Sequence, residues 1–431
     1  MTAEPDFDVV VVGAGIAGCV TAYRLAQAGR SVALVERGAA PGSKNLSGGV
    51  LYSRGLEEVF PDLLERAPIE RRITRNYLQL LNAESAVGID YQDRRLAEPV
   101  NAVTVLRARF DPWLAEQCEE AGADLLSGVR VDGVLREDGR VVGVRAGEDE
   151  LRAHVVVAAD GVNSFLARSA GLRGREPLHH LALGVKAVVA LPEERLRERF
   201  HLTGDEGVAY AVVGDCTRGV GGGGFLYTNR ASLSVGVVLR LDDLVAKGED
   251  SAAVFDHFLA HPFVAPLLEG GEVVEYGSHL VAEGGLAMLG EVVTDGMVVV
   301  GDAAGLTINT GLTVRGMDLA VASGVAAASA VGRALDAGDT SRDGLAGYRR
   351  ELLGSTAGRD LQTYAKAPAF LERERMYHDY GALLGDVLHR VYDHDLTPRR
   401  HLLDVARAEL RRSPVRVRDL VRDGLAGVRA L

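Results

Sequence analysis

The sequence predicts an α/β protein with a parallel sheet near the N-terminus, an antiparallel sheet in a separate lobe, and a helical C-terminal region. Residues 8–37 have the pattern of a buried strand, a glycine turn, a helix and a second buried strand. Residues 177–280 contain long strand-like stretches, and the chain beyond Thr340 has helical patterning. The helical breaks are expected near Pro368, Pro398 and Pro414.

The N-terminal segment carries the pattern of a dinucleotide-binding unit. Val9–Val12 form an apolar run typical of a buried parallel strand, and the second strand ends in Glu36. Between them, Gly13, Gly15 and Gly18 form GxGxxG, which permits a tight turn, close backbone approach to a pyrophosphate, and close helix–strand packing. The phosphates then lie at the helix N-terminus. Glu36 can accept hydrogen bonds from ribose hydroxyls and would repel a 2′-phosphate, so the pattern indicates FAD or NAD(H).

Composition argues against several classes of function. Lys and Arg total 48 and Asp and Glu total 60, and a net charge of −12 disfavours a nucleic-acid-binding protein. Cys19, Cys118 and Cys216 lack the spacing of a metal or iron–sulfur site, so we expect no metal. No signal peptide is expected before the first strand. The longest apolar tract, Leu319–Val331, is predicted to be too short and too weakly apolar to span a bilayer.

The segment after the glycine unit is expected to form a loop and then a helix. Residues 37–52 are rich in Gly, Ser and Asn, which favours a loop. Asp111 and Pro112 have the pattern of an N-cap and a first helical position. Arg107 and Arg109 then stand just before the predicted helix.

A hairpin and a second buried strand follow. Two alternating strands flank Asp138-Gly139, which is a strong hairpin signal. The buried strand at 154–159 ends in Asp160. In the antiparallel lobe we expect strands at 181–191, 207–213, 224–228 and 232–241, and a helix near 252–259.

A third buried strand, 297–300, precedes Gly301 and Asp302, and a helix rich in small residues is predicted from Leu312 to residue 335. Open parallel sheets bind ligands outside the carboxyl ends of their strands, so the glycine turn, Asp160 and Asp302 are expected to meet at one extended cofactor. Asp302 can hydrogen-bond the hydroxylated chain between the pyrophosphate and a flavin. The helix after Gly311 can direct its positive end at the ring.

Six segments together match one known pattern. They are GAGIAG at 13–18, ERGAAPGSKNLSGGVLY at 36–52, RARFDPWLAEQCEEAGA at 107–123, AADGVNSFLARSAGL at 158–172, GGGGFLYTN at 221–229, and GDAAGLTINTGLTVRGMDLAVASG at 301–324. With these segments, nearly the whole chain resembles the flavoprotein monooxygenase-like superfamily, and more closely the FixC-type electron transfer flavoprotein–quinone oxidoreductases. Among these segments, the lysine-asparagine loop and the GGFLYTN strand are the ones specific to the FixC type.

The resemblance implies a domain organisation. We expect a Rossmann-like FAD-binding domain of the glutathione reductase-2 type, an antiparallel-sheet substrate or quinone domain, and a helical C-terminal region. The expected ranges are 1–80, 104–176 and 281–336 for the FAD-binding domain, 81–103 and 177–280 for the substrate or quinone domain, and 337–431 for the helical region.

The resemblance also implies FAD as the cofactor and assigns residues to it. Glu36 is expected to hold the adenosine ribose, Arg37 and Arg109 to lie near the dinucleotide, and Asp302 to contact the ribityl chain. Residues 47–49 are expected near the flavin. The full expected set is Gly13, Ala14, Gly15, Ile16, Ala17, Gly18, Glu36, Arg37, Ser47, Gly48, Gly49, Arg109, Asp160, Gly301, Asp302, Gly311 and Leu312. No protein side chain is expected to be catalytic, because the flavin does the redox work.

The implied function is electron relay from an electron transfer flavoprotein, through FAD, to a quinone. Because the chain has no cysteine-ligated ferredoxin-like domain, a separate ferredoxin-like protein is implied as a further partner. A built-in nicotinamide domain should show a second GxGxxG, but the only other glycine cluster, Gly221–Gly224, leads into a predicted strand.

Alternatives stay open. They are a single-component FAD monooxygenase, a geranylgeranyl reductase-like enzyme acting on a small or isoprenoid substrate, and a non-catalytic FAD-stabilised subunit. A halogenase is disfavoured because Trp113 is the sole tryptophan.

Two segments bear on membrane contact. Residues 255–268 are strongly apolar, although a core helix and turn is the favoured interpretation. Residues 397–431 contain nine arginines and four acidic residues, a pattern that suits anionic lipid, an acidic partner or a solvated helical face. We expect a cytoplasmic protein, with peripheral contact at the cytoplasmic membrane as a further expectation.

Overall fold

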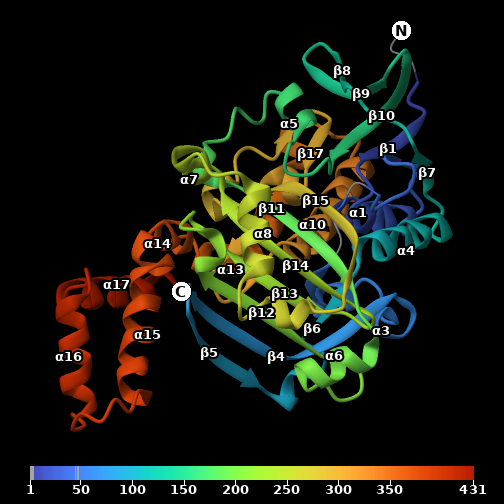
Figure 1. Cartoon of the computed structure of the whole chain (residues 1–431). Coiled ribbons are helices and arrows are strands. Elements are labelled where there is room, and N and C mark those ends of the chain that lie inside the picture. Colours follow the sequence, from blue (N-terminus) through green and yellow to red (C-terminus); the bar gives the residue numbers. More distant parts are fainter. Residues whose placement is uncertain (1–3, 44, 46–47) are drawn as a thin grey trace.

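Two β-sheets and the helices that cover them form the body of the protein, and further helices follow at the C-terminal end (Figure 1). The computed structural model describes residues 4–43, 45 and 48–431. The order of elements confirms the predicted α/β class.

The first sheet is mainly parallel. From one edge its strands are β16 (Val293–Thr294), β17 (Met297–Val299), β10 (Asp149–Ala158), β1 (Phe7–Val12), β2 (Val32–Glu36) and β7 (Asp124–Ser127), and the hairpin of β8 (Gly133–Glu137) and β9 (Arg140–Ala146) is attached to β10. In register, Val10 of β1 lies between Ala33 of β2 and Val156 of β10. The central strands are apolar throughout because neither face meets solvent, and Val10 is completely buried.

The predicted hairpin at Asp138 and Gly139 is confirmed. These two residues join β8 to β9 with φ angles of 46° and 84°, the left-handed pair that a two-residue type I′ turn requires. The buried strands predicted to end near residues 159 and 300 are also confirmed, as β10 and β17.

Helices α1 (Ile16–Gln27) and α10 (Met317–Asp336) pack against each other along the first sheet. A Cβ added to Gly324 would lie 2.8 Å from the carbonyl oxygen of Ala17, so a small residue there permits the close approach. Contrary to the sequence prediction, α10 is long and apolar enough to span a bilayer, and it is the one such helix in the described part of the chain. In its most apolar window 61% of the residues are buried inside the protein, as in a core helix.

The second sheet is mostly antiparallel. From one edge its strands are β15 (Glu272–Ala282), β11 (Leu181–Ala190), β14 (Ser232–Arg240), β13 (Gly222–Thr228), β12 (Glu206–Gly214), β4 (Ile69–Asn82), β6 (Ala102–Val105) and β3 (Gly49–Tyr52), and β5 (Ser85–Gln92) pairs with β4. Alternate residues of a strand point to opposite faces. Val185, Ala187 and Val189 of β11 enter an apolar core, whereas Lys186 lies on the other face.

The division into three domains stays a prediction. The predicted boundaries at 80/81 and 103/104 fall inside β4 and β6, and both strands belong to the second sheet. That sheet therefore starts earlier in the chain than the prediction places it. The reason is that β4 pairs with β12, far along the chain, and local patterning carries no information on such a contact.

Short helices connect the strands. They are α2 (Arg54–Glu57), α3 (Leu63–Arg66), η1 (Arg94–Leu96), α4 (Arg107–Glu120), α5 (Phe165–Ser169), η2 (Leu178–His180), α6 (Glu193–Phe200), η3 (Asp215–Thr217), α7 (Leu241–Lys247), α8 (Ser251–Ala260), α9 (Ala265–Leu268), η4 (Gly285–Met288) and η5 (Gly301–Ala304). The apolar segment 255–268 forms α8 and α9, and Phe255 and Phe258 are buried in the core of the second sheet. The favoured interpretation as a core helix and turn is confirmed.

The C-terminal region is helical, as predicted. Its helices are α11 (Arg342–Leu345), α12 (Gly347–Gly354), α13 (Thr356–Thr363), α14 (Ala367–Leu371), η6 (Glu374–Tyr377), α15 (Asp379–Tyr392), α16 (Leu402–Arg412) and α17 (Val417–Ala430). In Figure 1, α15 and α16 project from the body as a hairpin-like arm, and α17 returns toward α14.

Arg71 is a completely buried arginine of β4 that ties the second sheet to its loops. Its side chain is 1% exposed. Its guanidinium donates to the carbonyl oxygens of Asn229 at 2.7 Å, Glu206 at 3.2 Å and Gly204 at 3.3 Å. A buried charge held in this way stabilises the fold only while its hydrogen-bond partners remain.

We expect Arg71→Met to lower the free energy of unfolding by about 3 kcal/mol, because the substitution leaves several buried carbonyl oxygens without donors. Chemical denaturation followed by circular dichroism measures this change. Arg72→Met is the matched control, since Arg72 is 36% exposed and pairs with Asp205 at the surface. An equal, small effect of both substitutions would contradict the role given to Arg71.

Candidate functional site

The ends of three neighbouring strands meet at one edge of the first sheet, as predicted. β17, β10 and β1 are adjacent and parallel. A Cβ added to Gly13, at φ +108°, would lie 2.3 Å from the carbonyl oxygen of Ala159. A Cβ added to Gly301, at φ +60°, would lie 2.8 Å from Cβ of Ala17. The loops after the three strands therefore touch one another.

The glycine turn forms a cradle at the start of α1. The backbone N–H of Gly13 donates to the carbonyl oxygen of Val35 at 2.7 Å, and a Cβ at Gly18 would lie 1.9 Å from the carbonyl oxygen of Gly13. A Cβ at Gly15 would meet only Nη2 of Arg107, at 3.7 Å. The space over Gly15 is therefore open. It faces the positive end of a helix whose first turn begins at Ile16 and contains no acidic residue.

Glu36 closes one side of the cradle. Its Oε2 accepts from the backbone N–H of Ala14 at 3.1 Å, and its Oε1 accepts from that of Gly38 at 2.6 Å. These bonds hold the carboxylate at the end of β2, where a ribose would lie in a dinucleotide-binding unit. Arg37 follows it and is exposed.

The prediction that Asp111 caps a helix is wrong. Helix α4 begins at Arg107, and Pro112 lies inside it. The Asp111 carboxylate instead accepts from Nε and Nη2 of Arg107, at 2.6 and 2.8 Å, and from Nδ2 of Asn45 at 2.7 Å. Arg107 and Asp111 are four residues apart in one helix, a spacing that brings their side chains together. The sequence prediction missed this ion pair because it started the helix after Arg107.

Arg107 is the arginine that the structure places beside the cradle. It contacts the open side of Gly15, and its charge also acts on Asp302. Arg109 is 66% exposed and its Nη1 pairs with Oε1 of Glu70 at 3.3 Å. Its predicted contact with a dinucleotide stays a prediction.

The two acidic residues after the other strands have different surroundings. Oδ2 of Asp160 accepts from the backbone N–H of Leu166 at 3.0 Å at the start of α5, whereas the buried Oδ1 has no partner among the described residues. Burial raises the pKa of Asp160. Burial also raises the pKa of Asp302, against the opposing charge of Arg107. Asp302 lies on η5, directly after β17.

The helix predicted to start at Leu312 is shifted. Residues 308–315 form a hairpin of β18 (Ile308–Asn309) and β19 (Val314–Arg315), and α10 begins at Met317. Side chains stabilise the turn: Oδ1 of Asn309 accepts from the N–H of Gly311 at 2.8 Å, and Oγ1 of Thr310 accepts from that of Thr313 at 3.1 Å. Such local bonds compete with helix formation.

Because α10 begins later than predicted, the tip of a hairpin stands where the sequence analysis expected the start of a helix. Gly311 has φ +77°, and Leu312 is 61% exposed at the hairpin tip. The backbone of this hairpin, and not a helix end, is therefore the part of the chain available to face a flavin there.

The loop after β2 runs to the second sheet. A Cβ at Gly48, φ +58°, would lie 1.8 Å from Oγ of Ser234 on β14. A Cβ at Gly49 would lie 3.1 Å from Cε of Met317. Ser47 lies outside the described residues. Gly48 thus lies against β14, and Gly49, the first residue of β3, lies against Met317 at the start of α10.

The second sheet adds two basic side chains, Lys186 and His279, to which the sequence analysis gave no part in the site. Gly184 pairs with His279 across β11 and β15, so His279 and Lys186 lie on one face. Burial, together with Arg107, lowers the pKa of Lys186 to about 8. Burial, with Lys186, Arg107 and Arg37, lowers the pKa of His279. In the sequence, the available signal for this face was one lysine, Lys186, in an otherwise apolar predicted strand.

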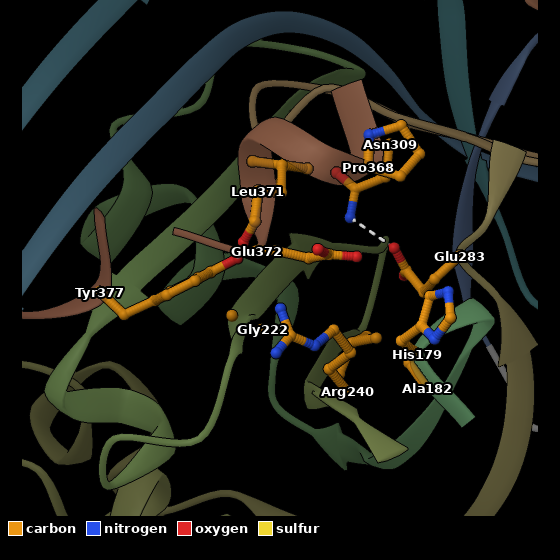
Figure 2. Close-up of a pocket in the computed structure, with 12 residues that line it drawn as sticks. His179, Ala182, Gly222, Arg240, Glu283, Asn309, Pro368, Leu371, Glu372 and Tyr377 are labelled. Carbon is orange, nitrogen blue, oxygen red and sulfur yellow. Dashed lines mark hydrogen bonds between the residues drawn. The ribbon is translucent and has the colours of Figure 1, made fainter. Parts of the chain in front are cut away.

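A cavity of about 50 Å³ lies at the end of this sheet, next to the 308–315 hairpin. Figure 2 shows Glu283, Arg240 and Glu372 pointing toward it from different elements, with Glu283 bonded to Asn309. Apolar atoms of Ala182, Val238, Pro368 and Leu371, and the backbone of Gly222 and Gly223, complete the wall. The cavity therefore combines apolar atoms with polar side chains, which are those of His179, Arg240, Glu283, Asn309, Glu372 and Tyr377.

Glu283 has an unusual titration. Burial raises its pKa from 4.5 to about 7, although Asn309 and Arg240 oppose the shift. Between these two values the folded state keeps a proton that the unfolded state has released. The free energy of unfolding therefore falls as pH rises through this window and levels off above it.

We expect Glu283→Gln to be more stable than the wild type at about pH 8 and to lose this advantage near pH 4.5, with a relative change of about 2–3 kcal/mol. Glutamine stays neutral, so it avoids the cost of a buried carboxylate. Denaturant titrations at both pH values measure the difference. A constant difference between the two proteins across this range would contradict the shifted titration.

Comparison with known proteins extends these observations. An FAD binding domain family model matches residues 6–206. The chain is 43% identical over 429 residues to the Probable electron transfer flavoprotein-quinone oxidoreductase YdiS of Escherichia coli, covering 99% of this chain and 100% of that protein. It is 42% identical over 433 residues to Protein FixC of Salmonella typhi, with the same coverage.

Solved structures share the fold at low identity. A geranylgeranyl bacteriochlorophyll reductase-like protein from Thermoplasma acidophilum has a TM-score of 0.72 and 21% identity, over 97% of this chain and 99% of that chain. The probable FAD-dependent monooxygenase pqsL from Pseudomonas aeruginosa has a TM-score of 0.61 and 20% identity, over 86% and 98%.

The residues present fit FAD, which is the cofactor that these comparisons indicate. The open space over Gly15 faces a helix N-terminus and a cation, as a pyrophosphate requires. The carboxylates of Glu36, bonded to the N–H of Ala14, and of Asp302, on which the charge of Arg107 acts, can accept from hydroxyl groups of the dinucleotide. In the described residues we find no cluster of side chains suited to a metal ion.

Proposed function

We propose, since this chain belongs to the family of FixC and the electron transfer flavoprotein–quinone oxidoreductases, that it carries electrons from a reduced electron transfer flavoprotein to a quinone. Its membership makes it an FAD-dependent oxidoreductase. The donor and the acceptor are the proposed part.

When bound, FAD supplies the redox chemistry, because its ring exchanges electrons with both partners. We assign the protein's own residues to holding it. Backbone N–H groups of residues 15–18 and the guanidinium of Arg107 bind the pyrophosphate, and Glu36 binds the ribose. Asp302 accepts from the hydroxylated chain. The predicted contacts of Gly48, Gly49, Gly311 and Leu312 with the ring belong to the same proposal.

The observation that carries the proposal is the cavity against the 308–315 hairpin. Its wall contains apolar atoms, and Arg240 and Glu283 are two of the polar groups that line it. A cavity of about 50 Å³ admits the carbonyl edge of a flat acceptor ring, and there a guanidinium or a protonated carboxyl can donate to the carbonyl oxygen. A quinone is an acceptor of this kind.

We propose that the last three helices, α15 to α17, contact an anionic membrane surface. Tyr392 is 77% exposed, Leu396 101% and Val428 86%, and arginines flank these apolar residues. Flotation with vesicles that contain anionic lipid tests this contact, and Val428→Asp should reduce it. A separate ferredoxin-like partner is proposed on the family resemblance, together with a cytoplasmic location.

The proposed function is tested under anaerobic conditions with the FAD-loaded protein. Reduced electron transfer flavoprotein should bleach the flavin absorbance of this protein, and a soluble quinone should restore it. Direct bleaching by NADPH, accelerated by an aromatic compound, would replace the proposal with a monooxygenase. Photoreduction without re-oxidation by quinone would indicate a non-catalytic subunit.

A further inference from the structure

Two polar atoms that face the cavity of Figure 2 have no hydrogen-bond partner among the described residues. They are Oε1 of Glu283 and Nη1 of Arg240, and both are buried. Buried polar atoms are nearly always paired, so an unpaired couple at a cavity wall points to a group that binds there.

One further polar atom of each side chain is held in place. Oε2 of Glu283 accepts from Nδ2 of Asn309 at 3.0 Å, and Nε of Arg240 donates to Oδ1 of Asp242 at 2.7 Å. Glu283 follows the end of β15, and Arg240 ends β14, so both positions are fixed by the second sheet. One oxygen of the carboxyl is therefore left free and directed at the cavity.

The volume limits what enters. A cavity of about 50 Å³ holds a few water molecules or the carbonyl edge of a ring, and not a whole quinone. A carboxyl that lines this cavity can contact water when the cavity holds water, and a carbonyl oxygen when the edge of a ring enters. Those are the two contacts that a proton donor requires.

This inference rests on the proposed function: we propose that Glu283 donates a proton to the quinone as it is reduced. The quinone gains two electrons from the reduced cofactor. As one quinone oxygen forms its O–H bond, the O–H bond of Glu283 breaks. The second quinone oxygen takes a proton from solvent, and a further solvent proton, relayed by water in the cavity, returns to Glu283. The net change is quinone plus two electrons and two solvent protons to quinol.

The charges around Glu283 suit a group that loses and regains a proton near neutral pH. Arg240 faces it from β14, Glu372 from the end of α14, Tyr377 from η6 and His179 from η2. Burial outweighs the opposing Arg240 and sets the Glu283 pKa at about 7. A general acid works best with a pKa near the working pH.

A first experiment uses infrared spectra of the oxidised, resting holoenzyme and needs no turnover. The C=O stretch of a protonated carboxyl should disappear as pH rises through about 7. The band should be absent from Glu283→Gln and retained in Glu272→Gln, which removes an exposed carboxylate at the other end of β15. A titrating band that persists in Glu283→Gln overturns the assignment.

A second experiment follows re-oxidation of the reduced holoenzyme by stopped flow. With a soluble quinone, Glu283→Gln should react about 100-fold more slowly and lose the pH dependence near neutrality. With ferricenium, which takes one electron and no proton, the variant should match the wild type. An unchanged quinone rate, or an equal loss with both oxidants, overturns the proton-donor role.

The same measurement separates this inference from the proposed function. A wild type that reacts with ferricenium but not with quinone removes the proposed function, and the proton donor with it. If the wild type and Glu283→Gln react with quinone at the same rate, only the proton-donor inference is contradicted. Flavin content and thermal stability of each variant confirm that holoenzyme is being compared.

Discussion

Gly15→Ala is expected to fold normally and to bind FAD about 100-fold more weakly, a loss of about 2.7 kcal/mol. The added methyl group meets only Nη2 of Arg107, at 3.7 Å, so the bare protein accommodates it. The methyl group nevertheless occupies the open space where a pyrophosphate approaches the backbone.

Gly13→Ala is expected to behave differently. Its φ of +108° disfavours any side chain, and the Cβ would lie 2.3 Å from the carbonyl oxygen of Ala159. We expect the free energy of unfolding to fall by about 3 kcal/mol even without FAD. The two substitutions in one loop thus separate cofactor binding from folding.

Denaturant unfolding of the apoprotein and titration with FAD, followed by flavin fluorescence, measure both effects. Gly332→Ala is the control, because a Cβ in the middle of α10 meets nothing within 4 Å and should leave FAD affinity unchanged. If Gly15→Ala retained full affinity, the open space over Gly15 would not be the pyrophosphate site. If Gly13→Ala were as stable as the wild type, the account of this turn would be wrong.

The second large effect is expected for Asp302→Ala, which should weaken FAD retention about 10- to 100-fold. A carboxylate that accepts from a ligand hydroxyl contributes about 1.5–3 kcal/mol. Burial raises the pKa of Asp302, and hydrogen bonds donated by ligand hydroxyls would favour its charged form. Asp302→Asn keeps an acceptor oxygen and should lose less.

The flavin content after purification and the FAD dissociation constant of the reconstituted protein test this role. Asp149→Ala is the matched control, since Asp149 is exposed at the far end of the adjacent strand β10. A purified Asp302→Ala protein with full flavin occupancy would count against the assignment.

Several elements of the fold could be predicted because their signals are local, whereas the contacts with the cofactor stay a prediction. The glycine turn, the acid at the end of β2 and the Asp138-Gly139 hairpin each depend on consecutive residues whose backbone geometry is restricted. The meeting of the three strand ends followed from a general property of parallel sheets.

The errors have a common cause. Asp111 resembles an N-cap in isolation, but Arg107 and Asn45 compete for its carboxylate and the helix starts earlier. Leu312 follows a glycine in a helix-like segment, but side chains of Asn309 and Thr310 hold a hairpin there. In both cases a side-chain partner outweighed the local propensity.

Local patterning was therefore sufficient for the α/β class, the dinucleotide turn and the buried strands, because short-range backbone sterics and apolar periodicity specify them. The place of β4 in the second sheet, the position of Arg107 beside Gly15, the cationic face with Lys186 and the buried Glu283 came from the folded chain alone. Each of these depends on burial or charge supplied by residues far apart in the chain, and no stretch of consecutive residues encodes such a contact.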